Sequence, residues 1–341
     1  MTATPVDKPP VVGPDFAQRW RHFVTGKVSW VPVLAALGIL IIMLILGQLY
    51  FGRFVTPRIM SSLLVDNAYL VVLAAGMTFV ILTGGIDLSV GAVMAFTGIV
   101  CARLLTIDVP LGVVVPIMIV TGAAFGLLIG VLVFYFDVQP FIASLACMFA
   151  ARGLCYVLAP NAIRVSDPSV LWLQSTKLGD PAGWYITPTG IMALLTIAIA
   201  AWILGYSRFG RTVYAIGGNE QSARLMGLPV ARTKVLVYVI SGICAGVAGL
   251  IFTSYTAAGY ALNGVGTELD TIAAVVIGGT LLTGGSGYVI GSLIGVLVYG
   301  VIKTSITFLG ADTSWTRITI GIMLLAFVVV QRLIVARTSR R

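Results

Sequence analysis

The chain has 341 residues, of which 59% are hydrophobic and only 10% are charged, and its formal net charge is +9. A soluble protein of this length needs much more charged surface, so the composition excludes that class and indicates an integral membrane protein. We interpret the positive charge as a sign of membrane topology, and it does not indicate nucleic-acid binding.

The predicted fold class is an all-α membrane protein with about ten transmembrane helices. A membrane-spanning helix needs about 20 mainly apolar residues. Segments of that kind lie at 31–50, 63–82, 86–105, 111–134, 138–158, 186–204, 235–257, 267–282, 288–308 and 315–333. We therefore predict a polar segment over 1–30, a transmembrane domain over 31–333 and a basic tail over 334–341.

Orientation follows from the Lys and Arg residues, which are enriched in cytoplasmic loops of membrane proteins. If the N-terminus is cytoplasmic, ten spans return the C-terminus to the same side. Most of the 21 Lys and Arg residues are then cytoplasmic, in 1–30, in a polar insert at 205–234 and near the C-terminus. The sequence therefore predicts that both termini lie in the cytoplasm.

Polar residues mark both ends of the second predicted span. Asp66 and Asn67 stand near its external start, and the motif TGGIDLSVG follows its other end. Within that motif, Thr83 precedes a Gly-Gly pair that interrupts the helix, and Asp87 lies just beyond it. A carboxylate near membrane depth costs roughly 2.5 to 3.5 kcal/mol, so it normally faces protein or water. Asp87 either lines a substrate path or caps a helix, and both interpretations stay open.

The insert at 205–234 carries the signals of a short, separate helix. Asn219 can cap its N-terminus, and Glu220 suits the positive end of the helix dipole. Gly227 stands where a left-handed C-terminal stop is expected, and Pro229 prevents continuation. A helix of about seven residues is not stable alone in water. We therefore expect this helix to dock on a cytoplasmic partner.

A second polar group surrounds the external start of the eighth span. Glu268 and Asp270 lie at that start, and Tyr260 and Asn263 precede them. These groups suit a neutral polyol, and the set contains no cationic clamp for an anionic substrate. Together with the polar pair at the second span, they form a predicted vestibule. Each carboxylate alternatively caps a helix N-terminus.

Glycines recur at every fourth position in two apolar segments, and such rows let helix backbones approach closely. The rows are Gly122, Gly126 and Gly130, and Gly287, Gly291 and Gly295. The sequence ILTGG at 81–85 also returns as LLTGG at 281–285. A duplicated transporter half would explain this echo, and so would chance in a glycine-rich chain.

Several catalytic signatures are absent from the sequence. It contains no GxxxxGK[ST] phosphate-binding loop, no HExxH and no CxxCH. The four cysteines lie in apolar segments without CxxC spacing, and His22 is the only histidine, so we expect neither a metal site nor a cofactor. If ATP drives this protein, its hydrolysis must belong to another chain.

Three long motifs resemble the permease subunits of bacterial ATP-binding-cassette monosaccharide importers of the ribose type. They are TFVILTGGIDLSVGAVMAFTG at 78–98, FGRTVYAIGGNEQSARLMGLPVARTK at 209–234 and ELDTIAAVVIGGTLLTGGSG at 268–287. Within this branch, the segments 66–91 and 255–270 look most like a permease subunit of galactofuranose importers.

The resemblance implies a non-catalytic subunit with the fold of ribose- and branched-chain-amino-acid-type permeases, in a bacterial inner membrane. It also implies a paralogous second permease subunit, ATPase subunits that bind the ATP, and a periplasmic sugar-binding protein. In this family the segment GGNEQSARLMG corresponds to the coupling helix that docks on the ATPase. The corresponding contact residues here are Gly218, Asn219, Glu220, Ala223, Arg224 and Gly227.

Two other function classes compete with this interpretation. A secondary transporter driven by an ion gradient would need carboxylates in mid-span, whereas the acidic residues here lie mostly at span ends. An intramembrane enzyme would need a nucleophile–base pair or a metal cluster. We therefore expect a permease for a furanose such as galactofuranose or for a pentose, with another small polar solute as the alternative.

Overall fold

The structure is a computed structural model that describes residues 30–180, 183–312 and 314–339. The predicted N-terminal segment 1–30 therefore lies outside the described residues, apart from Trp30. The longer helices are α2 (Trp30–Phe51), α4 (Ala68–Leu82), α5 (Val90–Leu105), α6 (Leu111–Tyr135), α7 (Pro140–Leu158), α9 (Pro188–Tyr206), α12 (Val230–Thr256), α14 (Val289–Phe308) and α15 (Ser314–Ser339). The shorter helices are α3 (Pro57–Val65), α8 (Pro168–Ser175), α10 (Arg208–Gly218), α11 (Glu220–Leu225) and α13 (Thr267–Ile277).

Each of the ten predicted spans contains a helix, but a count of ten spans is not confirmed. Six described helices are long and apolar enough to cross a membrane, or seven if α3 and α4 form one span bent by 51°. The segments predicted at 86–105 and 267–282 are shorter as helices, because the turn at 86–89 takes up the start of the first and the turn after Ile277, with Gly278 and Gly279, takes up the end of the second. Apolar composition alone therefore overstates the length of these two helices.

Three helices begin with the same local device, a polar N-cap followed by proline at the first helical position. Before α8, the carboxylate of Asp167 accepts hydrogen bonds from the backbone N–H groups of Ser169 and Val170. Before α9, the hydroxyl of Thr187 accepts one from Gly190 N–H. Helix α3 begins in the same way. Proline suits this position because its fixed φ is helical and its missing N–H would have no intrahelical partner.

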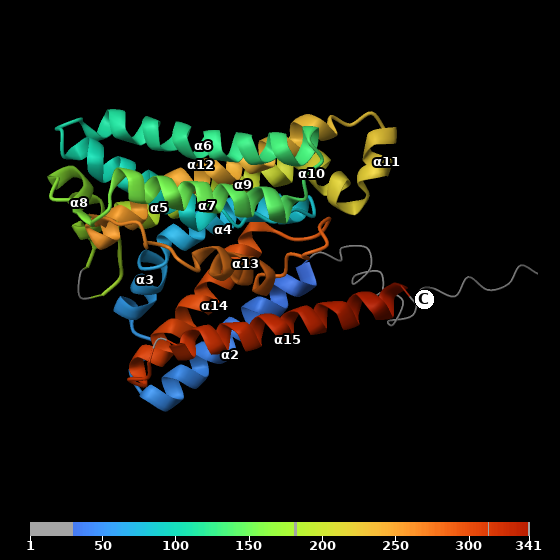
Figure 1. Cartoon of the computed structure of the whole chain (residues 1–341). Helices are drawn as coiled ribbons and strands as arrows, with labels where there is room; N and C mark the ends of the chain where they lie inside the picture. Colours follow the sequence, from blue (N-terminus) through green and yellow to red (C-terminus); the bar gives the residue numbers. More distant parts are fainter. Residues whose placement is uncertain (1–29, 181–182, 313, 340–341) are drawn as a thin grey trace, which may run out of the picture.

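Helix α4 forms the centre of the body, and all 15 of its residues are buried. Helices α12, α9, α14 and α13 pack directly against it. Helix α6 lies beyond α12 on one side, whereas α2 and α15 lie beyond α14 and α13 on the other, as Figure 1 shows. A helix that is buried on every side needs apolar residues all round, which explains the uniformly apolar sequence of α4.

The first glycine row lets α6 and α12 lie in backbone contact. A methyl group added at Gly122 would clash with the carbonyl oxygen of Gly242, and one added at Gly126 would clash with that of Tyr238. In the second row, methyl groups at Gly291 and Gly295 would clash with α13 and the turn after it. The prediction that these rows permit close helix packing is confirmed.

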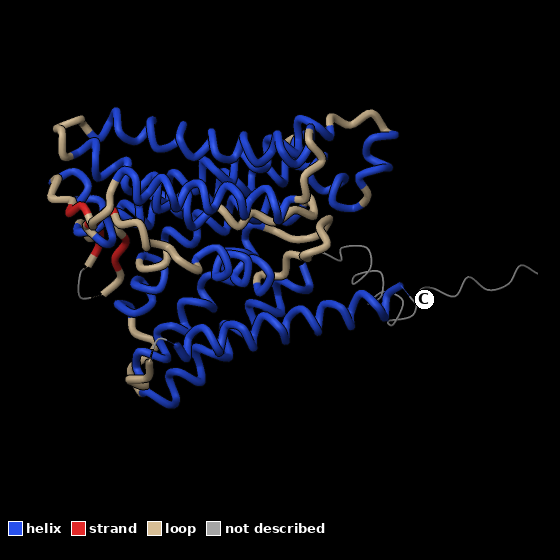
Figure 2. Tube along the Cα trace, viewed as in Figure 1, coloured by secondary structure: helices blue, strands red, loops and turns tan. Residues whose placement is uncertain are grey.

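The two ends of the body differ in structure. At one end lie α8 and two short antiparallel pairs, β1 (Ile163–Arg164) with β4 (Ala258–Gly259) and β2 (Leu178–Gly179) with β3 (Tyr185–Ile186). Helix α11 projects at the opposite end (Figures 1 and 2). The helices run between these ends, so any path across the protein must connect them.

Substitution of Gly122 by Ala is expected to destabilise the protein by about 1 to 3 kcal/mol, because the added methyl group pushes α6 away from α12. Thermal unfolding in detergent, followed by circular dichroism, measures the effect. The matched control is Gly112→Ala in the same helix, where nothing lies within 4 Å of the added atom. Equal melting temperatures for the two variants would contradict the close contact.

Candidate translocation path and coupling surface

Two helices begin inside the body, and their first turns meet. Helix α5 begins at Val90 and α13 begins at Thr267. A methyl group at Gly91 would lie 2.6 Å from Oε2 of Glu268 and 2.7 Å from the carbonyl oxygen of Gly264. Non-helical backbone at membrane depth is tolerated where protein buries it or where it lines a polar cavity. Discontinuous helices of this kind line the substrate sites of many transporters.

Asp87 joins the turn before α5 to α12. Its side chain is buried, and Oδ1 accepts hydrogen bonds from Ser89 N–H at 2.9 Å and from Ser89 Oγ at 2.6 Å. Oδ2 accepts a third bond from Ser241 Oγ at 2.8 Å. Both oxygens therefore have partners within the protein. This arrangement resembles a helix cap, and a direct role of Asp87 in the path stays a prediction.

Arg152 organises the loop that precedes α13. It lies in the apolar helix α7, and its Nη1 donates hydrogen bonds to the carbonyl oxygens of Ala261 at 2.5 Å and Asn263 at 2.7 Å. The amide of Asn263 in turn donates to the carbonyl oxygen of Ala258 at 3.2 Å. An arginine that interrupts an apolar helix was the available sequence signal, because such residues are commonly functional. Arg152 was not among the predicted site residues.

Glu268 lies beside this loop with one oxygen unsatisfied. Its Oε1 accepts a hydrogen bond from Gly266 N–H at 3.2 Å. Its Oε2 is buried and has no hydrogen-bond partner among the described residues. Tyr260 belongs to the same loop and is half-buried. Tyr260, Asn263 and Glu268 lie on the loop that Arg152 binds and at the start of α13, and we call these four residues the outer loop cluster.

The other predicted vestibule residues have separate partners. Asp270 accepts a hydrogen bond from the Tyr299 hydroxyl on α14 at 3.1 Å. Asn67 donates to the carbonyl oxygen of Leu63 at 2.8 Å, and Asp66 ends α3. In the described part of the chain, no hydrogen bond connects these three residues to the outer loop cluster. The predicted vestibule therefore divides into two groups.

Thr83 lies at the opposite end of α4, in a junction of glycine turns. The amide of Gly285 donates to the carbonyl oxygen of Leu82 at 2.9 Å, which places the two copies of the LTGG sequence side by side. Gly84, Gly284 and Gly285 all have positive φ angles, which glycine adopts without strain. A methyl group at Gly217, near the end of α10, would clash with both turns. We call this contact of three segments the glycine junction.

Helix α11 begins just after the glycine junction and has the predicted caps. The side chain of Asn219 accepts a hydrogen bond from Ser222 N–H at 2.7 Å, and Gly227 has a φ of +74°. Ala223 is buried beneath the helix. Leu225 and Met226 are 87% and 67% exposed. The predicted short helix is thus present, and it exposes large apolar side chains at the end of the molecule.

An ion-pair cluster fixes α11 to the next helix. Glu220 contacts Arg224 at 2.7 Å within α11 and Lys234 of α12 at 2.5 Å. Partial burial alone would raise the pKa of Glu220, but the hydrogen bonds and charges of Lys234 and Arg224 outweigh it and lower the pKa. Glu220 is therefore ionised at neutral pH. Gly218, the remaining predicted coupling residue, has open space around it.

No metal centre is apparent in the described residues, because no three His, Cys, Asp or Glu side chains gather in a suitable way. The four cysteines are buried and unpaired with one another, as small apolar residues would be. The chemistry that this arrangement supports is therefore hydrogen bonding to a polar solute and mechanical contact with a partner.

Comparison with known proteins identifies the family. A family described as "Branched-chain amino acid transport system / permease component" matches residues 59–328. The chain belongs to this family. It is a membrane permease component of the ATP-binding-cassette transporters, and it is not a catalytic subunit.

Curated relatives cover nearly the whole chain. The fructose import permease FruG of Bifidobacterium longum is 42% identical over 90% of this chain and 92% of its own length. The inner membrane ABC transporter permease YjfF of Escherichia coli is 44% identical over 88% of this chain and 92% of its own length. The ribose import permease RbsC of E. coli is 35% identical over 89% and 94%. The predicted relationship to the ribose-type branch is confirmed, and no solved structure matches the chain significantly.

Replacement of Asp87 by Ala is expected to cost about 1 to 3 kcal/mol of stability, because it leaves Ser241 and Ser89 without their buried acceptor. Asp87→Asn retains one acceptor oxygen and should lose less. Thermal unfolding and solute uptake in reconstituted vesicles are measured for both variants. Wild-type stability and full uptake in Asp87→Ala would show that the buried bonds are unimportant.

Replacement of Arg152 by Gln is expected to release the outer loop. Hydrogen exchange of the amides over 258–266 should become about tenfold faster, because hydrogen bonds from a charged group contribute roughly 1.5 kcal/mol or more. Arg164→Gln is the control, since Arg164 lies at the same end of the body with an exposed side chain. Unchanged exchange over 258–266 in Arg152→Gln would contradict the anchoring role.

Proposed function

We propose that this permease forms half of the translocation path of an ATP-driven importer for a monosaccharide. Three curated relatives support this class of system, since two are fructose and ribose import permeases and the third is an inner membrane ABC transporter permease. A furanose such as galactofuranose, or a pentose, is the proposed substrate. The outer loop cluster offers hydroxyl, amide and carboxylate groups to such a solute, while the only arginine in it is already bonded to loop carbonyls.

The observation that carries the proposal is the exposed apolar surface of α11. Leu225 and Met226 lie at one end of the body, on a helix held to α12 by Glu220 and Lys234. An exposed apolar pair on an anchored helix suits a protein–protein contact, in which central apolar residues carry much of the binding energy. The proposed partner is an ATPase subunit, which binds the ATP, so this chain needs no cofactor of its own.

The remaining features of the proposed assembly follow from this assignment. The end that bears α11 is cytoplasmic, both termini lie on that side, and the chain crosses a bacterial inner membrane ten times. Helices α5 and α13 then count as short spans within a bundle. A second, paralogous permease completes the path, and a periplasmic sugar-binding protein delivers the solute to the end that bears α8 and the strands.

An ion-coupled secondary transporter was the competing prediction, and membership of an ATP-binding-cassette permease family argues against it. The buried, unsatisfied Oε2 of Glu268 is the group that such a mechanism would use. Purification of the chain from its native membrane in mild detergent, followed by mass spectrometry, separates the two proposals. Recovery of an ATPase and a second permease supports the importer, whereas repeated recovery of the chain alone and in active form supports the secondary transporter.

Substitution of Leu225 by Asp should abolish uptake while the protein stays folded, because Leu225 is 87% exposed. Loss of a central apolar contact at an interface costs about 2 kcal/mol or more, or roughly 30-fold in ATPase affinity. Uptake and bound ATPase are measured in reconstituted vesicles. Leu225→Met is the matched control and should behave as wild type. Full uptake by Leu225→Asp, with ATPase still bound, would rule out α11 as the coupling contact.

A further inference from the structure

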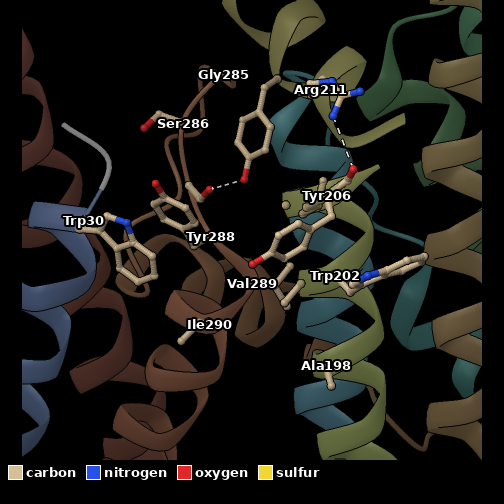
Figure 3. A pocket seen from close by; sticks show the side chains of 15 residues that line it. Trp30, Ala198, Trp202, Tyr206, Arg211, Gly285, Ser286, Tyr288, Val289 and Ile290 are labelled. Atoms are coloured by element: carbon tan, nitrogen blue, oxygen red, sulfur yellow. Dashed lines mark hydrogen bonds between the residues drawn. The ribbon is translucent and has the colours of Figure 1, made fainter. Parts of the chain in front are cut away.

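A large pocket lies outside both groups of predicted path residues. It has a volume of about 950 Å³ and lies between the end of α9 and the start of α14, with α10 and the first residue of α2 at its sides. Figure 3 shows Ala198, Trp202 and Tyr206 on one side and Tyr288, Val289 and Ile290 across from them. Neither the path nor the coupling helix uses this space.

Two fixed contacts form the walls of the pocket. The rings of Trp30 and Tyr288 stack with their centroids 4.4 Å apart, which joins α2 to the start of α14. The hydroxyl of Tyr214 donates a hydrogen bond to the carbonyl oxygen of Gly287 at 2.8 Å, which joins α10 to the same segment. The pocket is therefore held open by contacts between helices and is not a gap between loose side chains.

The pocket continues into an exposed apolar stripe along α9. Leu195, Ile199, Trp202 and Tyr206 recur at helical spacing and are between 56% and 78% exposed. The stripe leads from the middle of α9 to the pocket at its C-terminal end. An apolar stripe on a membrane helix faces acyl chains, so a lipid chain that follows it reaches the pocket directly.

The composition of the pocket matches the boundary between acyl chains and headgroups. Trp and Tyr residues concentrate at this level in membrane proteins, because their rings are apolar and their N–H and O–H groups are polar. Five aromatic residues line this one pocket: Trp30, Trp202, Tyr206, Tyr214 and Tyr288. Their position at the end of α9 and at the start of α14 and α2 agrees with that level.

The charge of the pocket favours an anion. Arg211 is its only charged lining residue, and the lining contains no carboxylate. Arg211 is exposed, and its Nη1 contacts only the carbonyl oxygen of Tyr206, at a long distance of 3.5 Å. Among the described residues it takes part in neither of the two ion pairs. Ser286 adds a hydroxyl group to the same lining.

We propose that this pocket binds an anionic phospholipid, whose phosphate contacts Arg211 and whose acyl chain lies along the α9 stripe. Basic pockets between membrane helices on the cytoplasmic side bind anionic headgroups in this way. The assignment to the cytoplasmic leaflet rests on the orientation proposed above. The choice of an anionic phospholipid does not depend on that orientation. The lipid fills a groove between α9 and α14 that residues 30–180, 183–312 and 314–339 leave open.

The test uses the full chain in phosphatidylcholine vesicles that contain a brominated lipid, which quenches nearby tryptophans. Dibromo-phosphatidylglycerol should quench the fluorescence at about fivefold lower concentration than dibromo-phosphatidylcholine, as expected from one Arg at the surface. The preference should fall in Trp30→Phe, which removes a reporter from the pocket wall. It should disappear in Arg211→Gln and persist in Arg208→Gln, an exposed arginine of α10 outside the lining.

Three outcomes would overturn the proposal. One is equal quenching by the two brominated lipids in the wild-type chain, a result that does not depend on any variant. Another is displacement of the anionic lipid by excess inorganic phosphate, which would indicate a site for a soluble anion. The third is a lipid preference that arises only after removal of residues 1–29, which would make the chain's own N-terminal segment the occupant. None of these readouts depends on sugar uptake or on the ATPase.

Discussion

The structure depends on the need to satisfy backbone polar groups where helices are broken inside an apolar body. An unpaired N–H or C=O group in a membrane interior costs several kcal/mol, so a broken helix needs partners from the protein itself. The glycine junction supplies one such partner, because Gly285 N–H donates to the carbonyl oxygen of Leu82. Asp87 supplies another at the start of α5, and Arg152 supplies a third by binding two carbonyl oxygens of the outer loop. At each break, the free backbone groups are therefore hydrogen-bonded by a residue that is distant in sequence or by a charged side chain.

The closely packed glycine rows stabilise the helices around these breaks. Backbone contact between α6 and α12, and between α14 and α13, leaves no room for side chains at the crossing points. Helix α12 also carries Ser241, which binds Asp87, and Lys234, which binds Glu220. One long helix thus connects the packed side of the body, the turn before α5 and helix α11. A displacement of α12 would therefore affect all three of these regions.

Much of this arrangement was predictable from sequence, and the remainder depends on tertiary contacts. The length of each apolar segment correctly predicted a helix in every span, and the cap residues Asn219 and Gly227 correctly predicted α11. Both signals are local in sequence. The predicted start of α13 at 267 agrees with the structure, but the true start of α5 and the true end of α13 were not predictable, since apolar residues continue through the turn before α5 and the turn after α13. The hydrogen bonds of Arg152 join residues more than 100 positions apart. The division of the vestibule residues likewise depends on the direction in which each side chain points, which sequence spacing near a turn does not determine.

The glycine junction brings together the two copies of the repeated LTGG sequence. The two copies lie in hydrogen-bonding contact and have similar positive φ angles at Gly84 and Gly284. The copies follow α4 and α13, which both end at this point, and precede α5 and α14, which both start beyond it. Two helix–turn–helix units therefore meet at their turns, and a duplicated half is one of the two explanations predicted for the repeated sequence. Gly217 packs against both turns, and α11 begins three residues later. A displacement of α11 would consequently reach the point where the two units meet through Gly217, and α12 through Lys234.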